Sequence, residues 1–378
     1  MKFMIFLLSF LTIFLGVNIY VPARISYYLH FYSSHTKLIY LFFLGAAFLS
    51  IAGFLLEQKF SSTYTQWGYV IGSVWLGFLL YIFITLFFID CFKFLFSIFG
   101  SDYSMALRTR YYAAGVILIA ITLLLIGGFI NARRPVIVNK KITIEKPLRN
   151  VQNLRVVVAS DLHFGAIIGK SYEKKFTEMV SQLQPDIVFL CGDIIDGNVT
   201  PVIRKGIGSH IKNLQPPLGV FAVTGNHEYI GDILKSKEFY QSINIPIIKD
   251  CLVVLDNGLQ IIGRKDAHSF TQLPLDSLME KANLEYPIVV LNHQPHHLQQ
   301  AADLGVDLHL SGHTHHGQLW PFNYITQALF DISWGYKKIN NSHFYVSSGF
   351  GTWGPPFRIG NKPEVLCMDI HFSKKIKE

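Results

Sequence analysis

The chain has 378 residues, of which 51% are hydrophobic and 15% charged, with a formal net charge of +8 at pH 7 and a mean hydropathy of +0.33. This composition is too apolar for a protein that is soluble along its whole length. The four cysteines form no CxxC pair, which argues against a disulfide framework or a zinc–thiolate site, and no basic stripe with interleaved aromatic residues indicates nucleic acid as a partner.

The first 130 residues contain only ten Lys, Arg, Asp and Glu residues. A helix needs about 20 apolar residues to cross a bilayer, and four runs meet this length: Phe3–Val21, Leu38–Leu56, Trp67–Phe92 and Tyr111–Ile130. The first run lacks a small-residue cleavage site and three further runs follow it, which favours a retained helix over a signal peptide. The sequence therefore predicts an all-α region of four transmembrane helices over residues 1–130.

This region is interpreted as an anchor, with a platform for a lipid substrate as the alternative. A transporter would be expected to carry ionisable residues inside its spans, but only Asp90 lies in one, near its end and close to Lys93. Basic residues are almost evenly divided between the two sides of the predicted spans. The pair Arg133 and Arg134, directly after the last span, favours a cytoplasmic position for the residues that follow.

After residue 134 the pattern changes to short β-branched runs separated by helical stretches. This alternation predicts an α/β domain with covered sheets over residues 131–378. A helix is expected over Ser171–Leu183. Strands are expected over Val136–Val138 with Ile142–Ile144, and over Arg155–Ser160, Asp186–Cys191, Gly219–Thr224, Leu252–Leu255, Leu259–Ile262, Pro287–Leu291 and Asp307–Leu310.

Polar side chains that can bind metals follow five of these strands in succession. They are Asp161 and His163, Asp193 and Asp196, Asn226 and His227, His293, and His313 with His315. The carboxyl ends of strands in α/β sheets are where ligands bind. Each residue alone would fit a structural role in a turn or a helix cap, but five sets in order favour a metal site.

The residue types indicate the chemistry of this site. Carboxylate, imidazole and amide donors suit Mn, Fe or Zn. Alternate residues of an extended segment project to the same side, so Asp161 and His163 are expected to hold one ion together. A carboxylate such as Asp193 can bridge two ions. Two ions about 3.5–4 Å apart can activate a hydroxide and hold a phosphoryl group during in-line displacement.

The ordered motifs DxH, GDxxD, GNH[DE], a single His and GHxH resemble those of the calcineurin-like metallophosphoesterases, from about Val136 to the C-terminus. The stretch SSGFGTWGPPFRIGNKPE, at Ser347–Glu364, resembles the membrane-associated bacterial branch of that family. The resemblance implies a four-layer αββα sandwich and two divalent metal ions as cofactors. It also implies that the first ion is held by Asp161, His163 and His315, that Asp193 bridges, and that the second ion is held by Asn226, His293 and His313.

In the same way, the resemblance implies that His227 is the acid that protonates the leaving oxygen, oriented by Asp196. The last motif contains an additional His316, so the choice of His315 as ligand rests on the spacing of the family. Arg358 is left with two interpretations, binding of a substrate phosphate or support of its loop. Glu228 is expected to support its own loop or to pair with a base.

The expected function is metal-dependent hydrolysis of a phosphoric ester or anhydride, with a phosphodiesterase favoured over a monoesterase. The membrane anchor points to membrane lipid as a partner and to a lipid-linked or envelope substrate. One version, by analogy with relatives, is pyrophosphate cleavage of a UDP-acylglucosamine lipid. An alternative is a module that senses phosphate without turnover, which the presence of both His227 and Asp196 argues against. No required protein partner is evident.

Overall fold

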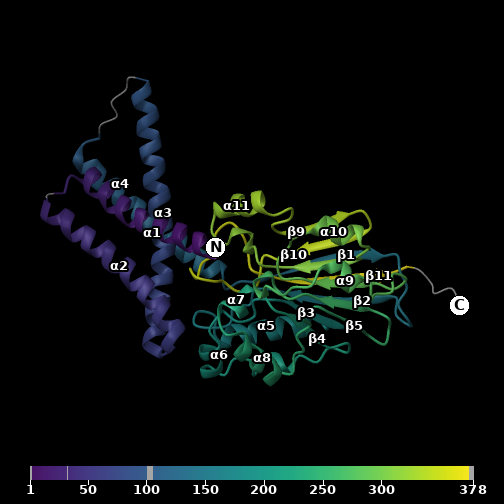
Figure 1. The fold of residues 1–378 in the computed structure, drawn as a ribbon. Helices are drawn as coiled ribbons and strands as arrows, with labels where there is room; N and C mark the ends of the chain where they lie inside the picture. Colours follow the sequence, from purple (N-terminus) through teal and green to yellow (C-terminus); the bar gives the residue numbers. More distant parts are fainter. Residues whose placement is uncertain (1, 32, 100–104, 374–378) are drawn as a thin grey trace. The chain divides into compact units, whose positions relative to one another are not determined.

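The computed structural model describes residues 2–31, 33–99 and 105–373, except that the side chains of residues 2–7 and 10 are outside the description. Figure 1 shows a set of long helices followed in sequence by a unit built from strands and short helices. The chain folds into two compact units, one of Met1–Gly128 with Gly354–Pro356, and a second of Phe129–Trp353 with Phe357–Glu378. We call them the helical unit and the α/β unit.

The N-terminal helices are α1 (Lys2–Leu29), α2 (Ser33–Phe60), α3 (Thr63–Ile98) and α4 (Leu107–Asn131). Among the described residues, α2, α3 and α4 are long and apolar enough to cross a membrane. The first predicted span falls in α1, partly on side chains outside the description. Membrane association therefore rests on three helices, and a fourth span stays a prediction.

Two local features bring α2 and α3 together. Ser62 accepts a hydrogen bond from the backbone N–H of Thr65 and Thr65 Oγ1 accepts one from the N–H of Ser62, which forms a capping box at the start of α3. A Cβ added to Gly53 would lie 2.6 Å from the carbonyl carbon of Gly68, so the two backbones approach closely because a side chain is missing.

Asp90 of α3 is paired within the helical unit. Its Oδ2 lies 2.6 Å from Arg24 Nε and accepts a hydrogen bond of 2.5 Å from the hydroxyl of Tyr20, while Oδ1 accepts one from Tyr28. An ionisable group within an apolar helix needs such partners. The pairing agrees with a structural role for Asp90 in joining α1 to α3.

The elements of the α/β unit follow in chain order. The strands are β1 (Val136–Ile144), β2 (Asn153–Ala159), β3 (Ile187–Cys191), β4 (Val220–Val223), β5 (Cys251–Val254), β6 (Gln260–Gly263), β7 (Ile288–Leu291), β8 (Leu308–Ser311), β9 (Gly335–Ile339), β10 (Ser342–Val346) and β11 (Glu364–Phe372). The helices are α5 (Lys170–Gln182), α6 (Thr200–Arg204), α7 (Asn226–Ile230), α8 (Ile233–Ser242), α9 (Leu275–Met279), α10 (Leu298–Asp303) and α11 (Phe322–Leu329), with the 3₁₀ helices η1 (Ile211–Asn213), η2 (Ala267–Ser269) and η3 (His315–Gly317).

The strands form two sheets, with orders β1-β11-β2-β3-β4 and β5-β6-β7-β8-β10-β9. In the first sheet β2, β3 and β4 run parallel to one another, and in the second β6, β7, β8 and β10 do so. β11 is parallel to β1 and antiparallel to β2. The carboxyl ends of the parallel strands within each sheet therefore meet at one edge.

Alternation along the strands separates the buried side chains into different clusters. In β2, Val156 and Val158 belong to a cluster that also contains Ile261 and Leu308 of the second sheet. The alternate residue Val157 belongs to a cluster with Phe176 of α5, Val202 of α6 and Phe239 of α8. A third cluster joins β7 to α9 and α10. One cluster thus draws on both sheets, and the other two draw on one sheet and helices.

Each predicted strand has a counterpart, and the helix expected at Ser171–Leu183 is α5. Residues 136–144 form one continuous strand of nine residues, rather than the short strand expected. The sequence reasoning made no prediction for β9, β10 or β11. β10 and β9 are the last two strands at one side of the second sheet, and β11 lies between β1 and β2 in the first.

Candidate metal centre

The predicted ligands lie at the carboxyl ends of strands from both sheets. Asp161 and His163 follow β2, Asp193 and Asp196 follow β3, and Asn226 and His227 begin α7 after β4. His293 follows β7, while His313 and His315 follow β8. The structure thus brings all nine predicted site residues to one region.

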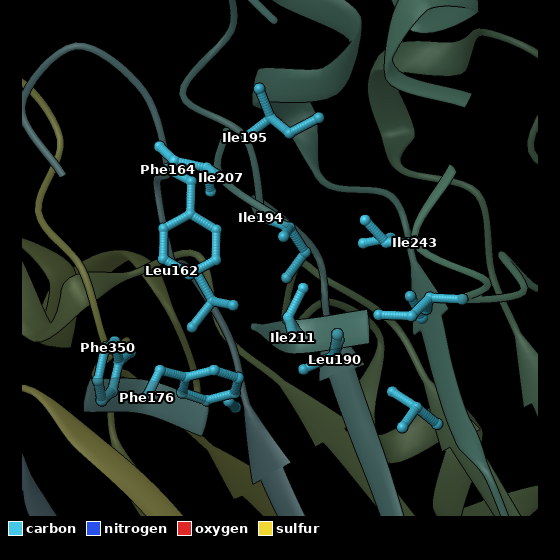
Figure 2. Close-up of a cluster of buried hydrophobic side chains, with 14 of the residues drawn as sticks. Leu162, Phe164, Phe176, Leu190, Ile194, Ile195, Ile207, Ile211, Ile243 and Phe350 are labelled. Atoms are coloured by element: carbon cyan, nitrogen blue, oxygen red, sulfur yellow. The ribbon is translucent and has the colours of Figure 1, made fainter. Parts of the chain in front are cut away.

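Backbone hydrogen bonds hold the loops after β2 and β3 side by side. Asp161 N donates to Gly192 O at 3.0 Å, and His163 N donates to Asp193 O at 3.0 Å. The apolar residues between the polar ones are buried in the core beneath. Figure 2 shows Leu162, Ile194 and Ile195 among these buried side chains. Hydrophobic packing therefore fixes the loops while their polar residues remain directed to the site.

A first group of donors consists of Asp161, His163 and His315, whose donor atoms lie within 4.8 Å of one another. His163 Nε2 is 3.0 Å from His315 Nε2, and His315 Nε2 is 3.3 Å from Asp161 Oδ1. All three side chains are buried. This is the set that the sequence analysis assigned to the first ion.

A second group consists of Asp193, His293 and His313, with the same 4.8 Å limit on the distances between donor atoms. His293 Nε2 lies 3.1 Å from Asp193 Oδ2 and 3.2 Å from Asn226 Oδ1. Asn226 Oδ1 is also 2.9 Å from His313 Nδ1. These four residues are the set assigned to the bridge and the second ion.

Asp193 lies between the two groups. Its Oδ2 is 3.9 Å from His163 Nε2, a donor of the first group, as well as 3.1 Å from His293 Nε2 of the second. Its Oδ1 accepts a hydrogen bond of 2.8 Å from the backbone N–H of His227. The geometry thus leaves Oδ2 directed toward donors of both groups.

His227 is the most exposed of the site histidines that form ion-pair contacts, with 17% of its side chain accessible. Its Nδ1 lies 3.1 Å from Asp196 Oδ1. The same carboxylate oxygen is 3.3 Å from His163 Nδ1, so Asp196 lies close to two imidazoles. His227 also falls in a third group of close donors, with His163 and Asp193.

Metal binding requires deprotonated donors. The surroundings of several site residues shift their pKa values so that the deprotonated form is favoured at pH 7. Burial would raise the pKa of Asp161 and Asp193, but the neighbouring His315 and His293 outweigh it, so both pKa values lie below their usual range. Burial lowers the pKa of His313 and of His315 to about 4, which leaves these imidazoles neutral at pH 7. Buried N and O donors with these charges fit a divalent cation of the Mn, Fe or Zn type.

The pKa of His227 is shifted in the other direction. Burial would lower it, but the charge of Asp193 and the contact with Asp196 outweigh burial and raise the pKa of His227 to about 9. His293 is similar, because Asp193 raises its pKa against the effect of burial. His293 Nδ1 lies 2.7 Å from the carbonyl oxygen of Cys191, which orients its Nε2 toward Asp193.

The loop conformation differs from the one assumed in the sequence analysis. Asp161 and His163 are not in an extended segment, because both have left-handed backbones with φ of 55° and 49°. Asp193, His313 and His315 also have positive φ, of 53°, 72° and 47°. Non-glycine residues adopt this region rarely and at a cost in free energy. The side chains converge because the loops turn sharply, and alternation along a strand is not the cause.

Glu228 stabilises the loops from beneath. Its carboxylate accepts backbone hydrogen bonds from Asp193 at 3.2 Å, Ile194 at 2.8 Å, Ile195 at 3.1 Å and Gly225 at 2.7 Å, and another from the hydroxyl of Tyr240 at 3.1 Å. Burial, followed by the charge of Asp193, raises the pKa of Glu228 to about 7. The expected support of its own loop thus extends to the loop that carries Asp193.

Of the two interpretations of Arg358, binding of a substrate phosphate and support of its loop, the contacts favour the second. Arg358 is fully buried, donates to the carbonyl oxygens of Gly349 and Gly351, and has Nη2 3.1 Å from His315 Nδ1. Its loop and the first metal group are therefore joined. The additional His316 is in none of the three groups of close donors, and its Nδ1 lies 3.0 Å from Ser333 Oγ.

The sequence reasoning did not identify what surrounds the second group. Asp266 Oδ2 accepts a hydrogen bond of 2.8 Å from Gln294 Nε2, and Asp266 Oδ1 lies 2.8 Å from His268 Nδ1. Gln294 follows His293 directly in the chain, and this adjacency is the one feature of the sequence that connects Gln294 to the second group. Asp266 caps the start of η2 and His268 lies within it, and no motif connects this segment to the site.

Mixed sheets with buried carboxylate and imidazole donors at their edge define an α/β metalloprotein. Residues 154–317 match the family model described as calcineurin-like phosphoesterase. The chain is 30% identical over 256 residues to an uncharacterized metallophosphoesterase of Aquifex aeolicus, which covers 65% of this chain and 96% of that protein. The chain therefore belongs to the family of calcineurin-like metallophosphoesterases.

Two further relatives differ in how much of this chain they cover. The chain is 28% identical over 397 residues to an uncharacterized metallophosphoesterase of Campylobacter jejuni, which covers 99% of this chain and 100% of that one. A Danio rerio protein named transmembrane protein with metallophosphoesterase domain is 30% identical over 268 residues, covering 66% of this chain and 60% of that protein. The chain spans 60% of the length of the first curated relatives it matches.

Proposed function

We propose that the protein is a membrane-anchored phosphoesterase that uses two divalent metal ions to hydrolyse phosphoric ester or anhydride bonds. The observation that carries the proposal is the pair of donor groups, Asp161 with His163 and His315, and Asp193 with His293 and His313. Asp193 Oδ2 is directed toward donors of both groups. When bound, two such ions would supply a hydroxide nucleophile at neutral pH and neutralise charge on the phosphoryl oxygens.

The residues of the chain then have separate tasks. The two groups hold the ions, with Asn226 as a further ligand of the second group, 2.9 Å from His313 Nδ1. His227 protonates the oxygen of the leaving group, because its side chain is more accessible than those of His163, His293 and His315 and its Nδ1 lies 3.1 Å from Asp196 Oδ1. Asp196 acts as a positioning residue, since its carboxylate orients the imidazole without reaching the substrate.

The finer assignments complete the proposal. Residues 1–130 form a multi-pass membrane region of four helices, and residues 131–378 form the catalytic domain, a four-layer αββα sandwich on the cytoplasmic side. Three described helices of sufficient length support the membrane assignment, and the cluster shared by both sheets supports the layering. The substrate is lipid-linked or part of the cell envelope, and a phosphodiester is favoured over a monoester.

Metal removal and replacement tests this function on the full chain in detergent. Chelation is expected to abolish hydrolysis of bis-p-nitrophenyl phosphate, and added Mn²⁺, Fe²⁺ or Zn²⁺ is expected to restore it with two ions bound per chain. Asp193→Asn should lose activity and ions together. Asp303→Asn, at the exposed end of α10, is the matched control and should retain both.

The same experiment distinguishes the alternatives. A chain that binds two ions but turns over neither bis-p-nitrophenyl phosphate nor p-nitrophenyl phosphate would be a phosphate-sensing module. Faster hydrolysis of the second compound would replace the diesterase assignment with a monoesterase. A chain that binds no divalent ion at all would refute the proposed mechanism.

A further inference from the structure

Helix α11 (Phe322–Leu329) exposes its large apolar residues, and none of its residues is buried. Phe322, Ile325 and Leu329, spaced by three and four residues, form one apolar stripe along the helix. Their exposed fractions are 39%, 53% and 71%, whereas the polar Asn323 and Thr326 are only partly exposed. A surface helix of a soluble domain normally directs its apolar stripe toward the core. Here the apolar stripe faces outward.

Two aromatic residues extend this stripe. Trp320, just before the helix, is 42% exposed, and Tyr324 within it is 61% exposed. Together Trp320, Phe322, Tyr324, Ile325 and Leu329 are called the α11 patch. Contiguous exposed apolar surface of this kind marks an interaction site, and Trp and Tyr are enriched where a protein meets the interface between membrane and water.

The α11 patch is connected by hydrogen bonds to the end of α4, the last helix long enough to cross a membrane. The side chain of Asn131, the final residue of α4, donates to the carbonyl oxygens of Arg358 at 2.9 Å and Asn361 at 2.7 Å. Between these two positions, the carbonyl oxygen of Ile359 accepts from the backbone N–H of Trp320 at 2.7 Å. One short segment thus holds both the end of α4 and the start of the patch.

Basic residues accompany this connection. Arg134 and Lys362 are exposed. The backbone of Arg134 donates to Asn131 at 3.0 Å, and Val136 N donates to Pro363 O at 2.9 Å, so the two basic residues lie on neighbouring segments. Lys and Arg near the end of a span are attracted to anionic lipid headgroups. The charge of this region therefore complements a membrane surface.

We propose that the α11 patch inserts into the interfacial layer of the bilayer that α4 enters, with anionic phospholipid as its partner. Insertion of the side chains by about 5–10 Å is typical of amphipathic helices that lie in this layer. The α/β unit is then attached to the membrane at two places, α4 and α11. Because η3, with His315, directly precedes this region, the first metal group is held close to the lipid headgroups.

Depth-dependent fluorescence quenching tests this proposal on the full chain, and it needs no catalytic activity. Cys91 and Cys251, which are not buried, are replaced by Ser. Leu329→Cys is then labelled with an environment-sensitive fluorophore, and single chains are placed in nanodiscs of phosphatidylcholine and phosphatidylglycerol. Nitroxide on the lipid acyl chain is expected to remove more than about half of the emission, while aqueous iodide has little effect.

Leu284→Cys in the same background is the matched control. Leu284 is 55% exposed and lies beside Gly305, whose carbonyl oxygen contacts Lys146, just beyond the end of β1. β1 begins next to the end of α4 and extends roughly 30 Å at about 3.3 Å per residue. The fluorophore at this position should respond to iodide and be insensitive to the lipid nitroxide.

Each other outcome at position 329 overturns the proposal. Quenching by iodide equal to that of the control would show a patch exposed to water. Shielding from both quenchers would show a patch covered by another part of the same chain, because each nanodisc holds a single chain. Ile325→Cys provides the same measurement if the Leu329→Cys variant does not fold, as judged by its melting temperature.

Discussion

Replacing His227 by Gln separates the role of a proton donor from that of a metal ligand. His227 belongs to a group of close donors with His163 and Asp193, so its position alone fits either role. The other two groups remain complete without it. If His227 donates a proton, His227→Gln should retain both ions and lose activity.

The size of the loss should depend on the leaving group. General acid catalysis contributes roughly 10²–10⁴-fold, which corresponds to about 3–5 kcal/mol of transition-state stabilisation. An alkoxide leaving group needs the proton and should show the whole loss. A p-nitrophenolate leaving group is stable as an anion and should show little. Asp196→Asn, which keeps the shape but removes the charge 3.1 Å from His227 Nδ1, should cost about 10–100-fold.

The assay compares kcat for methyl p-nitrophenyl phosphate, with its p-nitrophenolate leaving group, and for a dialkyl phosphate, on the same preparations. Metal content is measured on each preparation by atomic emission. A His227→Gln protein that has lost an ion would show that His227 is a ligand. An equal loss of kcat for both leaving groups, with both ions retained, would also contradict a proton donor.

Three other predictions concern the support of the site. Glu228→Ala leaves several buried N–H groups without an acceptor and should lower the free energy of unfolding by on the order of 4 kcal/mol. Denaturant titrations of the full chain should show a smaller loss for Glu228→Gln, and equal losses for the two variants would contradict this role. Gly312→Ala would place a Cβ 2.3 Å from Asp161 Oδ2, so metal content should fall from two ions toward one, and a retained value of two would contradict it. Arg358→Lys loses the planar contact with two carbonyl oxygens and His315, and should lower the melting temperature more than Lys362→Arg does.

The arrangement of the site could be predicted from sequence because it depends on strand order and residue type. Short β-branched runs end at Asp161, Asp193 and Asn226, and parallel strands bring such ends to one edge. The backbone conformation could not be predicted in this way. Asp161 and His163 have left-handed φ values, which remain uncommon although Asp and His adopt them more often than most residues do. Both residues donate backbone hydrogen bonds to the loop after β3, a contact between segments distant in sequence.

Supporting residues were harder to identify because their partners are distant in sequence. Glu228 belongs to a recognised motif, but its bonds to Ile194 and Ile195 depend on how two loops meet. Strand β11 was missed for a related reason. Its residues are almost all buried. The run is continuously apolar over Val365–Met368 and alternates only from Met368 to Phe372, so no single pattern marks the whole of it as a half-exposed strand.

The position of β11 has a consequence for biosynthesis. Val136 pairs with Glu364, so β1 and β2 are held together by a strand that the ribosome makes after every motif of the metal centre. While the nascent chain is still growing, β1 emerges next to the last apolar helix with no partner on either side. Such an unpaired strand is prone to wrong pairing, and pairing over this separation in sequence is slow. Deletions that remove Glu364–Phe372 should therefore yield chains that reach the membrane and then aggregate or are degraded, whatever the state of their metal ligands.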